Sequence, residues 1–358
     1  MAVRAKLLKN ANLAVVKLGT GILTDNRNRL ASGRIKQIVG QVERARRSGR
    51  EVVLVSSGAV AAGMEVLGHR IRPSRLEELQ ACAAVGQSRL MAVYQELFSA
   101  FDVQTAQVLL THADLQDHDR HLNARNTLMA LLAGGVVPIV NENDAVSFTE
   151  LTVGDNDKLA ALVATLLPAD LLVLLTTVEG LVRNYGKSNA KVVSSVKKID
   201  GPTRKHAGGT QSSTSVGGML SKLKAAEIVM RAGIPMIIGN GASRGVLSKM
   251  LAGEAVGTLF HPNEGKLKGR KRWIAFFHHP EGRVIVDKGA KLALRERGMS
   301  LLAPGVVRCE GEFAAGDVIR ICDTEGTEFA RGITKYSLEQ MNATTGKVVV
   351  HRDHLVVL

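Results

Sequence analysis

The feature that most constrains this chain is a repeated order of short apolar run, small or polar turn, and helical segment. Five aliphatic runs are typical of buried parallel strands: residues 13–18, 52–55, 136–140, 171–175 and 235–238. Helical spacing occupies residues 33–48, 59–67, 76–99, 119–133, 157–167 and 222–232. This alternation predicts an α/β fold, a three-layer αβα sandwich with a mostly parallel open sheet. Residues 203–218 lack any periodicity, so we expect a mobile loop there.

The pattern changes near residue 262. Residues 262–273 are polar and basic and are typical of a linker between a first domain at 1–261 and a second at 274–358. Short strand-like pieces separated by glycine-rich turns follow at residues 283–286, 305–308, 317–321, 328–333 and 347–351. The second domain is therefore predicted to be small and rich in β-structure.

Composition places the chain among globular proteins. Hydrophobic residues make up 45% of its 358 residues and charged residues 22%. No apolar run approaches the ~20 residues that a membrane helix needs, and the basic N-terminus lacks the apolar stretch of a secretory signal. Three cysteines fit a reducing compartment. We therefore expect a cytoplasmic protein.

The net charge of +14 is compatible with several kinds of partner. Residues 1–75 hold 15 Lys and Arg against 4 Asp and Glu, scattered over turns and helix faces. Such a balance suits anionic small substrates, nucleic acid, or merely a solvated basic surface. The scattered placement favours the first and third, so nucleic acid is not the expected partner.

Two glycine-containing turns carry lysines. Lys17 ends the first apolar run, before Gly19 and Gly21, and Lys222 lies in the first helical turn after Gly217-Gly218. Glycines allow a phosphate to approach the backbone, and a lysine at a helix N-terminus is unfavourable unless an anion lies there. The alternative is a surface lysine beside an ordinary turn. Neither the P-loop pattern nor G-x-G-x-x-G is present.

A cluster of carboxylates and amides follows the third apolar run. Its members are Asn141, Glu142, Asn143, Asp144, Asp155, Asn156 and Asp157. Side chains of this kind suit an amino-acid ligand, since carboxylates bind its ammonium group and amides its carboxylate; turn formation is the alternative. Ser57 follows the second run without the G-x-S-x-G pattern of a nucleophile, so we interpret it as a hydrogen-bonding residue for substrate.

Together these motifs carry a resemblance to a known family. They are Val-Val-Lys-Leu-Gly-Thr (15–20), Ser-Ser-Gly-Ala-Val-Ala-Ala-Gly (56–63), Ala-Ala-Val-Gly-Gln-Ser-Arg-Leu (83–90), Leu-Asn-Ala-Arg-Asn-Thr-Leu (122–128), Asn-Glu-Asn-Asp-Ala-Val (141–146), Val-Gly-Asp-Asn-Asp (153–157), Gly-Gly-Met (217–219), Val-Gly-Thr-Leu-Phe (256–260) and Lys-Arg-Trp-Ile (271–274). In this order they resemble the amino-acid kinase superfamily, most closely its glutamate 5-kinase family. The C-terminal part is similar to a PUA domain.

The resemblance implies roles for individual residues. Lys17 and Lys222 would contact the transferred phosphoryl group, and Asp157 would hold both lysines. Substrate glutamate would be bound by Ser57, Asp144 and Asn156. The nucleotide site would include Lys17, Thr176, Thr177, Val216, Gly217, Gly218, Met219, Leu220, Ser221 and Lys222. No metal-ligating residue is singled out.

It also implies an activity and its partners. The chain would phosphorylate the γ-carboxylate of L-glutamate with ATP and Mg²⁺, the first step of proline biosynthesis. Proline would act as a feedback inhibitor, and the chain would form a homo-oligomer, a dimer or tetramer. The reactive γ-glutamyl phosphate would be protected in a closed site or handed over to glutamate-5-semialdehyde dehydrogenase.

Three positions depart from the family pattern, on the nucleotide side or the phosphate path: Thr177 in place of Asp, Val216 in place of Thr, and Thr152 in place of Lys or Arg. They bear on nucleotide affinity or choice. Two other functions stay open. The chain could be another amino-acid kinase, acting on aspartate, N-acetylglutamate or carbamate, or an RNA-binding PUA protein with a weakened kinase domain.

Overall fold

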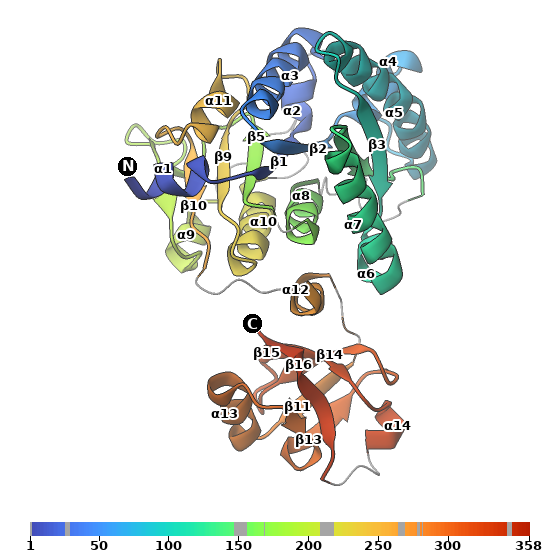
Figure 1. The fold of residues 1–358 in the computed structure, drawn as a ribbon, viewed down its shortest axis with the longest axis vertical. Coiled ribbons are helices and arrows are strands. Elements are labelled where there is room, and N and C mark those ends of the chain that lie inside the picture. The colour runs from blue at the N-terminus through green and yellow to red at the C-terminus, as the bar shows by residue number, and fades with distance from the viewer. Residues whose placement is uncertain are drawn as a thin grey trace. The chain divides into compact units, whose positions relative to one another are not determined.

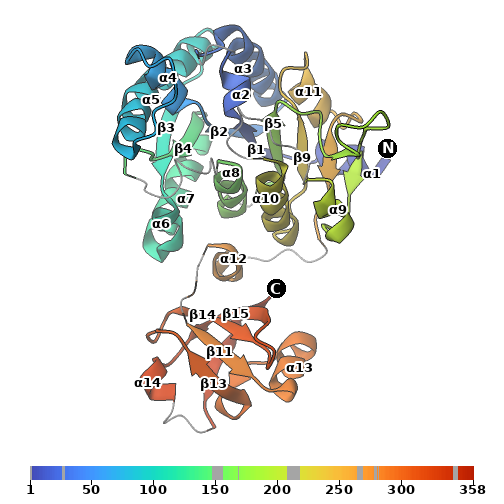
Figure 2. The same ribbon diagram turned by 180° about the vertical axis from the view of Figure 1, so that it is seen from behind.

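The computed structural model describes residues 2–25, 29–146, 156–167, 169–207, 218–263, 269–277, 280, 282–341 and 346–358. The chain divides into two compact units, Met1–Lys266 and Leu267–Leu358 (Figures 1 and 2). Each unit has its own sheet and its own hydrophobic core.

The first unit is built on an eight-stranded sheet with the order β3-β4-β2-β1-β5-β9-β10-β8. These strands are β1 (Leu13–Leu18), β2 (Glu51–Ser56), β3 (Thr105–Leu110), β4 (Val137–Glu142), β5 (Leu171–Thr176), β8 (Ser195–Val196), β9 (Met236–Asn240) and β10 (Thr258–Phe260). All neighbours pair in parallel except β9 and β10, which are antiparallel. A separate hairpin joins β6 (Val182–Arg183) to β7 (Lys191–Val192).

Helices cover both faces of this sheet (Figure 1). On one face are α2 (Thr20–Leu23), α3 (Ser32–Arg47), α4 (Ala59–Val66), α5 (Leu76–Ser99) and α11 (Val246–Leu251). On the other are α7 (His118–Ala133), α8 (Asn156–Leu166) and α10 (Met219–Arg231). The short helices α1 (Ala2–Lys9), α6 (His112–Gln116) and α9 (Gly201–Lys205) lie at the margins. The predicted three-layer sandwich is confirmed.

Strand β1 lies in the middle of the sheet because it is apolar on both faces. All six of its residues are buried, as expected for a parallel strand covered by helices on either side. It pairs with β2 on one edge and β5 on the other. After β1 the chain adds β2 on one side, and it later adds β5 on the other side. In open α/β sheets, ligands bind at the carboxyl ends of the strands around such a reversal of strand order.

The structure differs from the sequence-based expectation at several elements of the first unit. The short elements β6, β7, β8, β10, α1, α2, α6 and α11 were not predicted, and β3 and α9 show the physical reasons most clearly. Strand β3 was not predicted, because at the sheet edge its residues are mostly half-buried and form no apolar run. The prediction of a loop at 203–218 is wrong for residues 203–205, which belong to α9. Asp200 accepts a hydrogen bond from the backbone N–H of Thr203, and Pro202 lies in the first turn, so the local sequence starts a helix. Residues 208–217 lie outside the described residues.

The second unit holds a six-stranded sheet with the order β12-β16-β15-β14-β11-β13. Its elements are α12 (Gly269–Phe276), β11 (Arg283–Val286), α13 (Lys288–Arg297), β12 (Leu301–Leu302), β13 (Val306–Glu310), β14 (Val318–Cys322), β15 (Glu328–Thr334), α14 (Leu338–Met341) and β16 (Val348–Val357). The predicted β-rich region is confirmed. Helix α12 occupies part of the segment that we interpreted as a linker and packs on β15 and β16.

The three cysteines are free thiols, with Cys82 and Cys322 buried and Cys309 half-buried. Strand β11 lies between the strands that carry Cys309 and Cys322, which keeps them two strand spacings, roughly 10 Å, apart. A disulfide needs Cα atoms within about 7 Å, so these two cannot pair in this fold. Across the described ranges, no helix is both long and apolar enough to span a membrane.

Candidate functional site

The end of β1 presents a buried lysine. Lys17 is only 6% exposed and lies in register with Val55 of β2 and Leu174 of β5. The chain then turns at Gly19, whose backbone N–H donates to the carbonyl of Leu175 at 3.0 Å. A Cβ at Gly19 would come within 3.3 Å of that carbonyl oxygen, so glycine permits the close approach of β5 that fixes this turn.

Asp157 joins two lysines from distant parts of the chain. Its Oδ1 lies 2.6 Å from Lys17 Nζ, and its Oδ2 lies 3.0 Å from Lys222 Nζ. Asp157 is 1% exposed and Lys222 is 7% exposed. The ends of β1, α8 and α10 therefore meet at one point, and the three side chains expected to act together are in direct contact.

Electrostatics keep this cluster charged. Burial alone would raise the pKa of Asp157, but the neighbouring ammonium groups of Lys17 and Lys222 outweigh it and hold the pKa at about 2. Burial lowers the pKa of Lys222, and its ion pair with Asp157 opposes that shift. Two lysines with one carboxylate carry one net positive charge, which suits the approach of an anion.

The first turn of α10 supplies further polar groups beside this cluster. The N-cap residue is Gly218, which has no side chain to cap the first backbone N–H groups of the helix. Of the next two residues, Met219 is buried and Leu220 is exposed. The hydroxyl of Ser221 lies 2.9 Å from Asp157 Oδ2. Two residues expected at the nucleotide site, Val216 and Gly217, lie outside the described residues, as does Thr152. The backbone N–H groups that begin α10 and the ammonium of Lys222 together favour an anion at this end of the helix.

A chain of side-chain amides runs beside the lysine cluster. The Asn156 amide nitrogen donates to Ser57 Oγ at 2.9 Å and to Asn141 Oδ1 at 3.1 Å. The Asn141 amide in turn donates to Gln87 Oε1 at 2.8 Å. Gly58, at φ +94°, allows the tight turn that presents Ser57 before α4 begins. Ser57 and Asn156, both predicted as substrate residues, are thus brought together.

Gln87 was missed as a member of this site. It lies on α5 in line with Ala83, Leu90 and Tyr94, all buried, so a polar side chain interrupts an apolar helix face. That interruption is the signal from which the sequence could have identified Gln87. Within the described part of the chain, Gln87 Nε2 and Asn156 Oδ1 are buried without a hydrogen-bond partner. Leaving such groups unsatisfied is costly, which favours a ligand that would satisfy them.

Asp144 follows β4 in the turn at its carboxyl end. Burial raises its pKa to about 6, and the charge of Arg72 only partly opposes this. No hydrogen bond joins Asp144 to Ser57 or Asn156 in the described structure. The structure therefore places Asp144 at the same edge of the sheet without bringing it into contact with the other two predicted substrate residues.

Thr176 is the last residue of β5, and Thr177 follows it next to the turn after β1. The carbonyl of Thr176 accepts from the backbone N–H of Gly241 at 2.9 Å, which ties β5 to the end of β9. A Cβ at Gly21 would lie 2.8 Å from Thr177 Cγ2, so this threonine packs closely against the first glycine turn. Both threonines thus lie near the carboxyl ends of the central strands, at the same end of the sheet as Lys17.

Comparison with known proteins agrees with this architecture. Residues 12–240 match the amino acid kinase family, and residues 282–356 match the PUA domain. A glutamate 5-kinase of Geobacter sulfurreducens is 43% identical over 372 aligned residues, which cover 99% of this chain and all of that protein. A glutamate 5-kinase of an Enterobacter species is 42% identical, over 98% of this chain and all of that protein.

A solved structure shares the fold over a large part of this chain. Carbamate kinase of Giardia lamblia, determined with AMP-PNP, has a TM-score of 0.52 and 17% identity, covering 71% of this chain and all of that one. The family match extends over most of the first unit and the curated relatives align along almost the full length. This chain therefore belongs to the amino acid kinase family, within its glutamate 5-kinase branch, and carries a C-terminal PUA domain.

Proposed function

We propose that this chain transfers the γ-phosphoryl group of ATP to the γ-carboxylate of L-glutamate, forming γ-glutamyl phosphate, the first intermediate of proline biosynthesis. The observation that carries the proposal is the buried contact of Lys17, Asp157 and Lys222 at the carboxyl end of β1. Relatives with 43% identity over nearly the whole chain bear the name glutamate 5-kinase. The carbamate kinase that shares the fold was solved with an ATP analogue.

The reaction needs positioning and charge neutralisation more than acid–base chemistry. The γ-carboxylate of glutamate has an ordinary pKa of about 4.3 and is already ionised at neutral pH. One of its oxygens forms a bond to the γ-phosphorus as the bond from that phosphorus to the bridging oxygen breaks and ADP leaves. Lys17 and Lys222 would neutralise charge on the transferred group. Asp157, ionised because its pKa is held at about 2, would fix the spacing of the two ammonium groups.

The amide chain is the proposed glutamate site. Ser57 and Asn156 are hydrogen-bonded to each other, and Asn156 keeps a buried acceptor without a partner. Asp144 would bind the substrate ammonium once its carboxyl group is ionised. The nucleotide would bind across Thr176, Thr177 and residues 216–222, where the N-terminus of α10 attracts phosphate.

Mg²⁺ would enter with the nucleotide. No group of three or more His, Cys, Asp or Glu side chains within the described ranges could hold a metal ion. Both Asp157 oxygens already contact lysines. Mg²⁺ commonly uses substrate phosphates as ligands, so ATP itself would hold the ion here, while the lysines act as the chain's own counter-charges.

The domain boundaries that we propose are a kinase domain at 1–261, a linker at 262–273 and a PUA-like domain at 274–358. The two family matches lie inside the two outer ranges. The motif resemblance further supports a homo-oligomer, inhibition by proline at or near the glutamate site, and handover of the unstable product to glutamate-5-semialdehyde dehydrogenase. Size measurement in solution and competition between proline and glutamate test the first two.

The deciding experiment measures ADP release with MgATP and traps the acyl phosphate with hydroxylamine. We expect hydroxamate only when L-glutamate is present. Aspartate, N-acetylglutamate and carbamate are tested in parallel. Turnover with one of these and none with glutamate would make that compound the phosphoryl acceptor in the proposed reaction. Absence of turnover with all four, together with salt-dependent RNA binding, would favour the RNA-binding alternative.

A further inference from the structure

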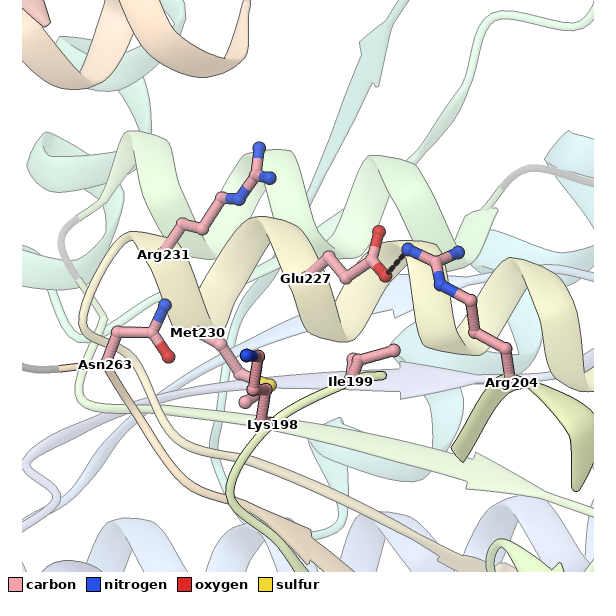
Figure 3. Close-up of a pocket in the computed structure, with 7 residues that line it drawn as sticks. All are labelled: Lys198, Ile199, Arg204, Glu227, Met230, Arg231 and Asn263. Atoms are coloured by element: carbon pink, nitrogen blue, oxygen red, sulfur yellow. Dashed lines mark hydrogen bonds and ion pairs between the residues drawn. The ribbon is translucent and has the colours of Figure 1, made fainter. Parts of the chain in front are cut away.

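A pocket lies on the first unit, along α10 rather than at its N-terminus (Figure 3). It has a volume of about 150 Å³ and is open to solvent. Its walls are Lys198, Ile199, Arg204, Glu227, Met230, Arg231 and Asn263. From Lys222 to Arg231 the helix advances nine residues, about 13 Å along its axis, so this pocket is separate from the lysine cluster.

Positive charge dominates the walls. Three of the lining side chains are cationic and one is anionic. The anionic one, Glu227, is already bonded to Arg204, as Figure 3 shows. Within the described residues, Lys198 and Arg231 have no carboxylate within ion-pair distance. Cations grouped around a hollow raise the local concentration of anions more than the same cations spread over a convex surface.

Both positive and negative groups lie close to the pocket lining. His261, two residues before Asn263, has a pKa lowered first by burial and then by the charges of Lys197 and Arg4. A carboxylate just outside the lining, Asp200, accepts hydrogen bonds from Thr203 as the N-cap of α9. Its pKa is lowered mainly by those hydrogen bonds and slightly by Lys198, so this carboxylate offsets part of the positive field.

We propose that this pocket binds a small phosphate-bearing anion, as a site distinct from the one that performs phosphoryl transfer. Arg204, held by Glu227, and Arg231 carry planar guanidinium donors of the kind that match phosphate oxygens, and Lys198 adds a third positive charge to the lining. The Asn263 amide supplies a neutral donor at the rim. Because the same helix carries Lys222 in its first turn and Arg231 in its last, an occupant would contact the element that positions a catalytic lysine.

Calorimetric titration of the full chain with inorganic phosphate, and separately with pyrophosphate, tests the proposal. The wild type is compared with Lys198→Ala/Arg231→Ala, and Lys249→Ala, an exposed cation on α11, is the matched control. We expect the double variant to lose one phosphate site, or to bind there about tenfold or more weakly, since each charge-assisted hydrogen bond contributes substantially. A stronger response to pyrophosphate than to phosphate would assign a diphosphate ligand, and the reverse a monoester.

Two outcomes would overturn the proposal. One is an unchanged number of sites and unchanged affinity in the double variant. The other is an equal loss in Lys249→Ala, which would mean that the anion responds only to total charge. The readout is binding rather than turnover, so it does not depend on the proposed kinase activity. If the wild type bound phosphate at this pocket but showed no kinase activity, the proposed function would be contradicted and the proposed phosphate site would stand.

Discussion

At the scale of single residues, Asp157 is the group on which the site depends most. Its carboxylate is almost fully buried and touches ammonium groups from β1 and α10. A buried charge is tolerable only with such partners, and removal of one partner leaves the others uncompensated. The same carboxylate therefore has a structural role and a positioning role, which different measurements separate.

The structural role predicts a loss of stability in Asp157→Asn. We expect the free energy of unfolding at neutral pH to fall by about 3 kcal/mol, because two buried lysines lose their counter-charge. Urea unfolding checks this, with Glu65→Gln, an exposed residue of α4, as a control that should change little. Since the folded pKa of Asp157 is about 2 and the unfolded value about 3.8, its contribution is complete above about pH 4 and is lost as pH falls toward 2. An equal loss in both variants would contradict this account.

The catalytic role of Lys222 predicts a large effect on turnover. Lys222→Ala should lower kcat by about 100-fold or more, as when a major electrostatic contact to the transition state is removed. Lys224→Ala, an exposed lysine two residues further along α10, is the control and should retain kcat. The hydroxamate assay measures both. Wild-type kcat in Lys222→Ala would remove this lysine from the mechanism.

Asp144 predicts a pH dependence of substrate binding. With a pKa raised to about 6, it is ionised above that pH and protonated below it, so the KM for glutamate should rise as pH falls through about 6. The γ-carboxylate, with its ordinary pKa of about 4.3, stays ionised over that range. Initial rates between pH 5 and pH 8, an interval that brackets the shifted pKa, should show this for the wild type.

The matched variant for this test is Asp144→Asn. It should have a higher KM throughout and no further rise at low pH, with kcat little changed. The same pH profile in Asp144→Asn as in the wild type would assign the titration to another group.

At the scale of elements, glycines set how closely α4 and α5 can pack. A Cβ at Gly63 would lie 1.8 Å from the carbonyl oxygen of Cys82, and a Cβ at Gly86 would lie 1.8 Å from that of Ala59. These are backbone atoms, so no side-chain rotation relieves the overlap. Helix α5 carries Gln87, and α4 begins just after Ser57. The distance between the two helices therefore also sets the position of the amide chain.

The close packing predicts that Gly63→Ala is destabilising although alanine favours helices. We expect a loss of about 3 kcal/mol or more in the free energy of unfolding, since overpacking forces the helices apart. Gly40→Ala in α3 is the control, because its Cβ would meet only the Arg44 side chain at 3.8 Å. That change should be neutral or stabilising by up to about 1 kcal/mol. Equal stability of the two variants would argue against the close-packing interpretation.

Elements with a strong local pattern were predictable from the sequence. Strand β1 has the predicted bounds, and α5 spans Leu76–Ser99 as its spacing indicates. The edge strand β3 was missed because it is only half-buried, and α9 because its start depends on Asp200 and Pro202 rather than on periodicity. In the site, motif order pointed to Lys17, Asp157 and Lys222. The local pattern marks Gln87 only as a polar residue on an apolar helix face, and its partner Asn141 is fixed by a tertiary hydrogen bond.

At the scale of the whole molecule, every described residue of the proposed site belongs to the first compact unit. Lys17, Asp157 and Lys222 all lie within Met1–Lys266, and the second unit has a separate core. None of the described residues proposed for the transfer step belongs to the PUA domain.

This independence predicts the behaviour of a truncated chain. Residues 1–266 alone should fold cooperatively and phosphorylate glutamate with kcat comparable to that of the full chain. Thermal unfolding and the hydroxamate assay measure the two properties, and Lys222→Ala in the same truncated chain is the negative control. A folded but inactive fragment would show that the PUA domain contributes to catalysis.

The position of β1 also has a consequence for synthesis. β1 is made first of the strands but pairs with β5, and its lysine meets a partner on α8 and a second lysine on α10. At 5–20 residues per second, about 10–40 s separate the synthesis of Lys17 from that of Lys222. The edge of β1 that pairs with β5 stays without its neighbour until Leu171–Thr176 has been made, and the proposed phosphoryl-transfer site stays incomplete until Lys222 has been made. The order of translation thus delays catalysis until the fold is nearly closed, and leaves that edge as the surface that a nascent-chain chaperone would cover.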